Sequence, residues 1–208
     1  AAATVSAGVA PAPTFVHPAR ESADTPGSNL DDLTMQAIRD ALTRAQRVVV
    51  YKSAKYSIEA PLVIGAALGG ASPEQLASLR AIGLPLGIAF QLRDDLLGVF
   101  GDPEVTGKPA GDDLREGKRT VLIALAQQEL PATAIRLMDE LLGDPDLDEA
   151  QIAMLQATLT NTGAVDKLEQ VIDEQVLLAQ KAIASAGFSE LATAGLTQLA
   201  ALVSQRAS

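Results

Sequence analysis

Hydrophobic residues recur every three or four positions along most of the chain, the spacing that places them on one face of an α-helix. One face of the segment 164–186 carries Val165, Leu168, Ile172, Val176 and Ala179. This spacing predicts helices over residues 30–51, 58–68, 73–99, 119–128, 131–142, 147–159, 164–186 and 189–205. Strand-like alternation is missing, and residues 48–50 are the only β-like triplet, so we expect an all-α fold.

Local signals mark the ends of the long helix predicted over 73–99. Ser72, Pro73 and Gln75 supply a capping hydroxyl, a proline at the first helical position and a reciprocal capping amide. Residues 101–117 are rich in glycine and polar groups and predict a long loop. Residues 1–29 are rich in Ala, Pro, Ser and Gly, which is typical of a disordered or linker-like arm. We therefore expect a single helical domain over residues 30–208.

The composition narrows the possible functions. Aromatic residues make up only 3% of the chain and hydrophobic residues 48%, so the core is aliphatic, as in close-packed helices. A formal net charge of −10 argues against a general nucleic-acid-binding protein, because such proteins need a cationic surface. Cysteine is absent and His17 is the only histidine, which argues against thiolate metal sites, cysteine nucleophiles and a Ser-His-Asp triad.

No apolar run approaches the roughly 20 residues that a transmembrane helix requires. The first residues lack the basic region of a signal peptide. The sequence therefore predicts a cytoplasmic protein without a transmembrane segment.

One cluster of residue types suits metal and phosphate chemistry. Asp94 and Asp95 lie late in the predicted helix, with Phe90 and Gln91 one turn earlier on the same sides. Two carboxylates at the mouth of an aliphatic cavity form a hard oxygen site, which suits Mg²⁺ that also binds substrate phosphates. The sequence thus indicates Mg²⁺ and a diphosphate beside a hydrophobic pocket.

Basic residues near the loop fit the same chemistry. Lys108 and Lys118 lie in or beside the glycine-rich segment, where their ammonium groups would meet a diphosphate. Neither feature is specific alone, since acid pairs on helices are most often solvated and glycine-rich loops are commonly turns. The loop also lacks the residue order of a P-loop. Arg93 is expected to be a solvated charge on the helix surface.

The order of residues over 90–118 resembles the second aspartate-rich motif of the polyprenyl diphosphate synthases, which include the farnesyl and geranylgeranyl diphosphate synthases. Phe-Gln-x-x-Asp-Asp begins at Phe90, and Gly-Asp-Pro-x-Val-Thr-Gly-Lys begins at Gly101. Asp113 and Gly-Lys at 117–118 complete the match. Upstream, Tyr-Lys-Ser at 51–53 is similar to the family's Lys-Thr helix segment, with Ser53 at the threonine position.

The resemblance implies an antiparallel helical bundle of the isoprenoid synthase type around a central hydrophobic cavity, assembled as a homodimer. It also implies a prenyltransferase that condenses isopentenyl diphosphate with dimethylallyl, geranyl or farnesyl diphosphate. Three Mg²⁺ ions would draw the diphosphate from the allylic substrate, leaving an allylic carbocation. The double bond of isopentenyl diphosphate would attack it, and a proton would pass to the released diphosphate.

For the metals and the cation, the resemblance assigns roles to five residues. Asp94 would ligate Mg²⁺, Asp95 would assist directly or through water, and Asp113, or alternatively Asp112, would order metal-bound water. Ser53 and Gln91 would place oxygen dipoles near the carbocation.

For the substrates, the resemblance assigns roles to four further residues. Lys52 and Lys108 would bind the allylic diphosphate. Phe90 would line the isopentenyl site, and Lys118 would close the mouth of the pocket.

The sequence departs from the family pattern in two ways. Gly98 stands at the fifth position of the motif, where the family usually has Asp. The first aspartate-rich motif is not found: the similar run at 31–35 ends in Met35 and lies too close to Lys52. We therefore expect an enzyme whose amino-terminal half is missing, and the chain as written should not catalyse. The alternative is a non-catalytic regulatory subunit of a heteromeric prenyl diphosphate synthase.

Overall fold

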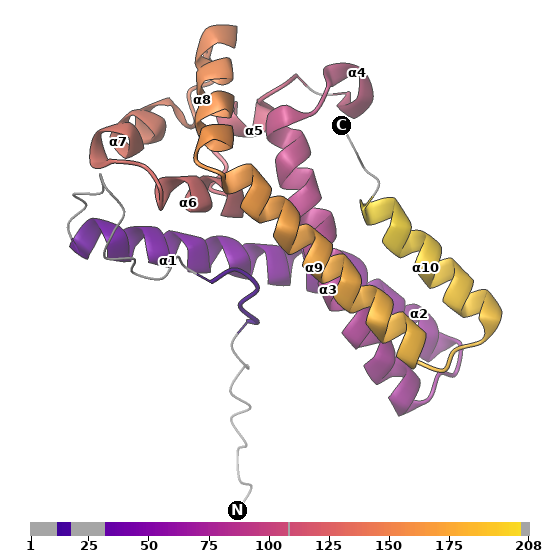
Figure 1. The fold of residues 1–208 in the computed structure, drawn as a ribbon. Helices are drawn as coiled ribbons and strands as arrows, with labels where there is room; N and C mark the ends of the chain where they lie inside the picture. The colour runs from indigo at the N-terminus through magenta and orange to yellow at the C-terminus, as the bar shows by residue number, and fades with distance from the viewer. Residues whose placement is uncertain (1–11, 18–31, 108, 205–208) are drawn as a thin grey trace, which may run out of the picture.

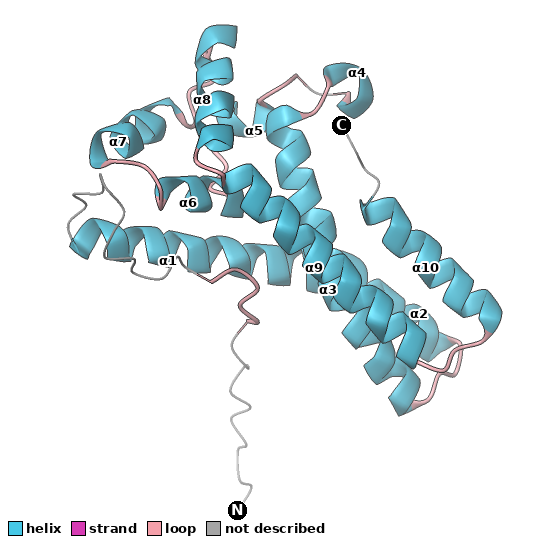
Figure 2. Ribbon diagram, in the orientation of Figure 1, coloured by secondary structure: helices cyan, strands magenta, loops and turns pink. Residues whose placement is uncertain are grey.

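The computed structural model describes residues 12–17, 32–107 and 109–204, and this part of the chain is helical without strands (Figures 1 and 2). Its helices are α1 (Asp32–Val48), the π-helix η1 (Val49–Glu59), α2 (Ala60–Leu68), α3 (Pro73–Phe100), α4 (Pro103–Thr106), α5 (Asp112–Arg115), α6 (Val121–Gln127), α7 (Ala132–Leu141), α8 (Glu149–Asn161), α9 (Ala164–Ser185) and α10 (Glu190–Ser204). The predicted all-α fold is confirmed. None of the helices in the described ranges has both the length and the apolar character that a membrane span requires.

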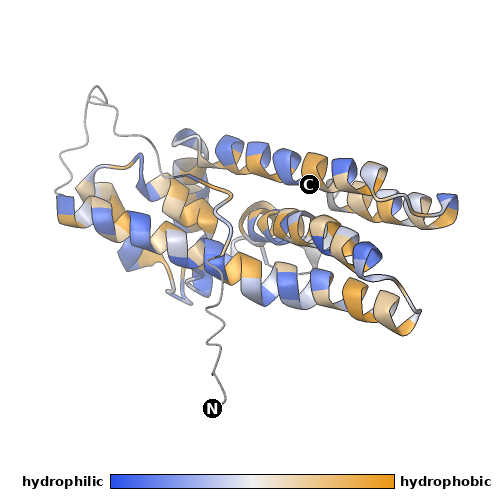
Figure 3. Cartoon of the chain, turned by 90° about the horizontal axis from the view of Figure 1, so that it is seen from below, coloured by the Kyte–Doolittle hydropathy of each residue, from blue (hydrophilic) through white to orange (hydrophobic). Residues whose placement is uncertain are grey.

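Helix α3 is the centre of the molecule. It packs chiefly against η1 and α9, and α9 runs along it in the opposite direction (Figure 1). Helix α10 then returns alongside α9. Most helices have a hydrophobic and a hydrophilic side (Figure 3). Every residue of α6 is buried, so this short helix forms the core at the other end, between α1, α8 and α9.

The predicted start of α3 is confirmed in detail. Ser72 Oγ accepts a hydrogen bond from the Gln75 N–H (3.3 Å), and Gln75 Oε1 accepts one from the Ser72 N–H (2.9 Å). This reciprocal capping satisfies two backbone donors that the first helical turn leaves unpaired.

The break expected between residues 51 and 58 is not observed. Helix α1 continues through η1 into α2, and the residues at both junctions, Val48 and Ala60, have helical backbone angles. The Ala60 N–H bonds to the carbonyl of Lys55, five residues back, as in a π-helix. The segment that carries Lys52 and Ser53 is therefore a wider π-helical stretch within one continuous helix that runs from α1 to α2.

Two glycines allow α3 to approach η1 very closely. A Cβ at Gly87 would lie 2.5 Å from the Cα of Ala54, and one at Gly83 would lie 2.9 Å from the Cα of Glu59. Gly83 and Gly87 are one turn apart and therefore share a face of α3. This contact between backbones sets the separation of the two elements that carry most of the predicted site.

The polar loop predicted over 101–117 contains two single-turn helices, α4 and α5. Helix α5 is followed by Gly117, whose backbone has a positive φ of 68° and packs against Gly143. Leu114 of α5 is buried, and the carbonyl of Leu114 accepts a hydrogen bond from the Gly143 N–H (2.9 Å). The second half of this loop is thus anchored to the core.

Part of the arm predicted over residues 1–29 is attached to the helical domain. Gln46 of α1 is buried, and its Oε1 accepts hydrogen bonds from the N–H groups of Phe15 (3.0 Å) and Val16 (2.9 Å). Its Nε2 donates to the carbonyl of Val16 (2.9 Å). Residues 12–17 therefore lie against α1, while residues 1–11 and 18–31 are outside the described ranges.

Candidate active site

The acid pair lies on the last turns of α3, as predicted. Asp94 is exposed, whereas Asp95 is buried with only 6% of its surface accessible. Phe90 and Gln91, one turn earlier, are half-buried on the same two sides of the helix. The two neighbouring carboxylates therefore stand in different environments.

A chain of hydrogen bonds joins η1 to the acid pair. Ser53 Oγ donates to Gln91 Oε1 (2.5 Å), and Gln91 Nε2 donates to Asp95 Oδ1 (2.8 Å). The same amide nitrogen lies 3.5 Å from Asp94 Oδ2. Because its NH₂ group is directed to the acids, the carbonyl oxygen of Gln91 is fixed toward η1. Four of the predicted site residues thus form one network.

Burial controls the protonation of Asp95. Loss of solvent raises the pKa of this carboxyl from 3.8 to about 7, and repulsion from Asp113 and Asp94 adds to the rise. The hydrogen bond from Gln91 and the charge of Lys118 act in the opposite direction. Near neutral pH Asp95 is therefore poised between its neutral and its charged form, and a bound cation would favour the charged form.

The raised pKa of Asp95 can be tested by measuring stability as a function of pH, with a chelator present to remove metal ions. The stability contributed by neutral Asp95 should be complete below about pH 4 and lost as the pH rises toward 7, because the unfolded chain ionises first. Asp95→Asn should remove this loss and be more stable than wild type above pH 7, by on the order of 2–4 kcal/mol. Urea unfolding of both proteins from pH 4 to 8 measures the difference. Identical pH profiles would show that Asp95 ionises freely in the folded protein.

Helix α5 brings a third carboxylate to the end of α3. Asp113 is buried and forms an ion pair with Lys118, which also pairs with Glu116 (2.9 Å). Partial desolvation lowers the pKa of Lys118, but the hydrogen bonds and charges of Asp113 and Glu116 outweigh it and raise the pKa. Lys118 is therefore a fixed cation, although it is tied to acids rather than open to solvent on all sides.

The structure describes Lys52 but not Lys108, the two other lysines of the predicted site. Lys52 is exposed on η1, next to Ser53, and forms no ion pair with the described residues. It is therefore available to an anion near the Ser53–Gln91 network. Lys108 lies outside the described residues.

An apolar groove begins at Phe90. It has a volume of about 530 Å³ and is lined by Ile58, Leu62, Leu86, Phe90, Leu199 and Leu202, among others. These residues come from η1, α2, α3 and α10, so the groove lies one turn below Asp94 along α3. A charged end and an apolar groove adjoin, which is the arrangement the sequence predicted.

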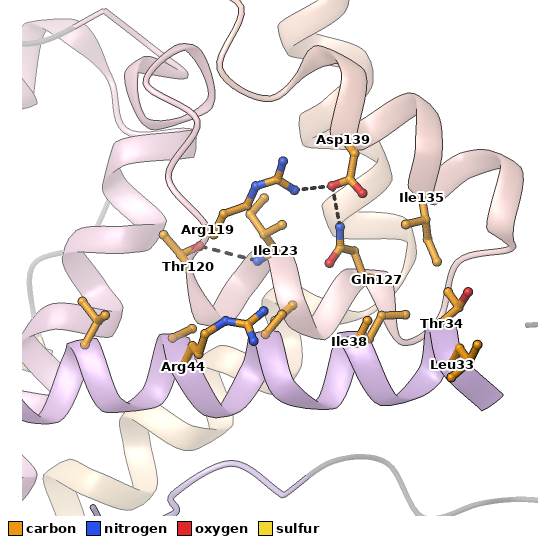
Figure 4. A pocket seen from close by; sticks show the side chains of 15 residues that line it. Leu33, Thr34, Ile38, Arg44, Arg119, Thr120, Ile123, Gln127, Ile135 and Asp139 are labelled. Atoms are coloured by element: carbon orange, nitrogen blue, oxygen red, sulfur yellow. Dashed lines mark hydrogen bonds and ion pairs between the residues drawn. The ribbon is translucent and has the colours of Figure 1, made fainter. Parts of the chain in front are cut away.

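A second groove lies elsewhere, between α1 and the pair α6 and α7 (Figure 4). Its volume is about 660 Å³, and none of the predicted site residues lines it. Within it Arg119 pairs with Asp139, which also accepts a hydrogen bond from Gln127 (3.0 Å), and Arg44 is a further cation in the lining. Nothing in this groove adds to the candidate site.

The expectation of a solvated Arg93 is wrong. Its side chain is only 13% exposed and makes two bonds to Glu169 of α9, at 2.5 and 2.6 Å. The pair ties α9 to α3 directly beside Asp94. The two residues are 76 positions apart, so helical spacing could not reveal the contact.

Removing the counter-charge of Arg93 should destabilise the protein. Glu169→Gln would leave a largely buried guanidinium without its anion, and we expect a loss of about 1–3 kcal/mol in the free energy of unfolding, since Glu169 itself is partly exposed. The matched control is Glu129→Gln, which breaks a more exposed pair with Lys167 and should cost less than about 1 kcal/mol. Equal losses in urea unfolding would contradict the special role of the Arg93 pair.

The donor set at the end of α3 fits Mg²⁺. Asp94 offers an exposed carboxylate, and Asp95 stands beside it, so both are hard oxygen donors. Among the described residues, no group of three acidic or histidine side chains could hold a metal alone. A magnesium ion here would therefore complete its shell with water and phosphate oxygens, as Mg²⁺ commonly does.

Comparisons with known proteins agree on one family. Residues 20–159 match the family model described as Polyprenyl synthetase. A geranylfarnesyl diphosphate synthase of Aeropyrum pernix is 41% identical over 112 residues, covering 54% of this chain and 34% of that protein. A short chain isoprenyl diphosphate synthase of Methanothermobacter thermautotrophicus is 30% identical over 150 residues, covering 72% of this chain and 46% of that protein.

Solved structures are similar in fold. The geranylgeranyl pyrophosphate synthase of Corynebacterium glutamicum, complexed with isoprenyl diphosphate and magnesium, has a TM-score of 0.72 and 35% identity, covering 86% of this chain and 57% of that one. A polyprenyl synthetase of Streptomyces coelicolor has a TM-score of 0.63 and 27% identity, covering 82% and 57%. This chain thus spans between a third and a half of the curated relatives described above.

Proposed function

Because this chain belongs to the polyprenyl synthetase family, we propose that the whole protein acts as a prenyltransferase, which condenses isopentenyl diphosphate with an allylic diphosphate to give a longer polyprenyl diphosphate. The observation that carries the proposal is the hydrogen-bonded row from Ser53 through Gln91 to the acid pair, next to the apolar groove at Phe90. Diphosphate and hydrocarbon would lie at the two ends of this row.

The acid pair would hold the metal ions. When bound, Mg²⁺ supplies Lewis acidity and a template for the departing diphosphate. Asp94 would contribute its exposed carboxylate, and Asp95 would contribute the second charge once it loses its proton. Asp113 would order a metal-bound water molecule without binding the metal itself. Three ions in the complete site are part of the proposal, as the family resemblance implies.

The chain's other residues would orient the substrates. Lys52 would bind the allylic diphosphate together with Lys108, and Lys118 would close the pocket mouth. As the carbon–oxygen bond breaks, its electron pair leaves with the diphosphate and a carbocation remains. Ser53 Oγ and the carbonyl of Gln91 would face that charge as preorganised dipoles.

Phe90 would line the isopentenyl site at the entrance of the apolar groove. The double bond of isopentenyl diphosphate forms the new carbon–carbon bond, and a proton then passes to the released diphosphate. Phe90 and the aliphatic residues around it would keep water away from the carbocation, because water would otherwise react with the carbocation.

The names of the relatives support a catalytic protein over a regulatory subunit of a heteromeric synthase, because the proteins with 41% and 30% identity are both called synthases. Both Asp94 and Asp95 are present, and a non-catalytic subunit would have no need of this acid pair. The proposal includes a homodimer and a cytoplasmic location. Sedimentation velocity tests the first, and fractionation of the source cells tests the second.

The direct test is incubation of the whole protein with labelled isopentenyl diphosphate, Mg²⁺ and dimethylallyl, geranyl or farnesyl diphosphate in turn. We expect a labelled, elongated prenyl diphosphate with at least one primer, and no product with chelator. Absence of metal-dependent product with every primer would refute the proposed activity.

A further inference from the structure

Helix α8 touches both ends of the loop that joins α3 to α5. Ile152 and Gln156 are one turn apart, so they share a face of α8. Gln156 Nε2 donates a hydrogen bond to the carbonyl of Val99 (2.6 Å), in the last turn of α3. Ile152 lies against Gly111, directly before α5, since a Cβ at Gly111 would be 2.7 Å from Ile152 Cγ2. One face of α8 therefore contacts the start and the end of the loop.

The bond to Val99 meets a need that the helical pattern of α3 leaves open. A carbonyl in a helix normally accepts from the N–H four residues on, and here that residue is Pro103, which has no N–H. Val99 is buried, so a carbonyl without a partner there would be costly. Gln156 supplies the donor, although α8 packs chiefly against α9 and α6. The bond is therefore a specific link between α8 and the end of α3.

Arg115 of α5 fixes the other end of the loop. Its Nη1 donates to the carbonyl of Ala110 (3.1 Å), and its Nη2 donates to the carbonyl of Leu147 (3.3 Å), just before α8. The planar guanidinium thus ties the last part of the loop to the segment that leads into α8.

Both ends of the loop adjoin the candidate site. Val99 lies one turn after Asp95 on α3. At the other end, α5 carries Asp113, whose carboxylate lies against Gly98 of α3. The positions of the two ends therefore set how α5 meets the acid pair.

We infer that Gln156 and Arg115 are positioning residues of the candidate active site, which fix the two ends of the loop to α8 and to the segment before it. Neither residue contacts the acid pair, and each acts through the backbone carbonyls that it binds. A shift of either end would move α5 relative to the end of α3. The consequence for a metal–diphosphate complex rests on the proposed function.

Hydrogen exchange tests whether the two residues hold the loop. The amide of Gly101 reports on the start of the loop, and the amide of Asp112 reports on its end, since both are hydrogen-bonded there. Gln156→Met keeps the length of the side chain and removes the donor, so exchange at Gly101 should become at least about tenfold faster. Arg115→Lys keeps the charge and loses the planar fork, so exchange at Asp112 should become faster by a similar factor.

Binding tests whether the held loop matters for the site. Calorimetry of the whole protein with inorganic pyrophosphate at saturating Mg²⁺ measures affinity without catalysis. Gln156→Met and Arg115→Lys leave every proposed ligand in place, and each should weaken pyrophosphate binding about tenfold, as for residues that support a metal site. In turnover assays, KM for the allylic diphosphate should rise by a similar factor, while kcat should change by less than about threefold.

Gln127→Met is the matched control. It removes a side-chain hydrogen bond to Asp139 (3.0 Å), away from the loop, so it should lower Tm about as much as Gln156→Met and bind pyrophosphate as wild type does. Wild-type affinity in both Gln156→Met and Arg115→Lys, whatever their Tm, would overturn the inference. If wild type itself binds no pyrophosphate with Mg²⁺, the proposed function fails. Exchange at the loop ends then decides whether the two residues hold the loop, and unchanged exchange would overturn this as well.

Discussion

Asp94→Ala in the whole protein is expected to lower the rate of prenyl transfer by at least about 100-fold while leaving Tm within about 2 °C of wild type. Second-layer residues around metals already cost about 10–100-fold when removed, so loss of a direct ligand should cost more. Stability should barely change because Asp94 is exposed and its charge repels Asp95. Initial rates under saturating substrates, with a thermal melt of each protein, measure both effects.

The matched control is Asp173→Ala, which removes an exposed aspartate from the middle of α9. This variant should keep both wild-type rate and wild-type Tm. A large fall in Tm for Asp94→Ala would instead show that the carboxylate is structural. An unchanged rate would remove Asp94 from the metal site.

Gly87→Ala is expected to lower the free energy of unfolding by about 3 kcal/mol, or Tm by about 6–12 °C. The added methyl group would lie 2.5 Å from the Cα and 3.0 Å from the carbonyl oxygen of Ala54. These are backbone atoms of η1, so the clash cannot be relieved by rotating a side chain. The helices must separate, which would also lengthen the 2.5 Å bond between Ser53 and Gln91.

Gly65→Ala provides the contrast, because it makes the same change inside helix α2 with no atom within 4 Å of the new methyl group. There we expect a gain of about 0.5–1 kcal/mol, since alanine loses less backbone entropy in a helix than glycine. Urea unfolding of both variants separates close packing from helix propensity. Gains at both positions would mean that α3 and η1 are not in backbone contact.

The sequence was sufficient to predict those structural features that depend on interactions between residues close together along the chain. The start of α3 was predicted because Ser72 and Gln75 cap each other within one turn. The π-helix was not predicted, since hydrophobic spacing does not separate a bond to the residue four back from one to the residue five back. Residues 101–117 were predicted as a long polar loop, but the segment contains the helical turns α4 and α5, and Leu114 of α5 reaches the core.

The candidate site divides in the same way. Helical spacing correctly placed Phe90 and Gln91 one turn before the acids. Ser53 and Gln91 are 38 residues apart, so helical spacing could not predict their hydrogen bond. Only the family resemblance assigned the two residues to the same site. The contact of Asp113 with Gly98 was not foreseen, because it depends on the course of the loop between them.

Gln46 has a consequence for how the chain tolerates change near its start. The amide recognises only peptide groups at positions 15 and 16, with donors and acceptors arranged as in a pair of neighbouring strands. These hydrogen bonds do not depend on which side chains the peptide carries, although Ala12, Phe15 and the buried Val16 also pack their side chains against the core. Proline is the exception, because it has no N–H to offer. The attachment of this segment to α1 therefore depends more on Gln46 than on the polar side chains of the segment itself.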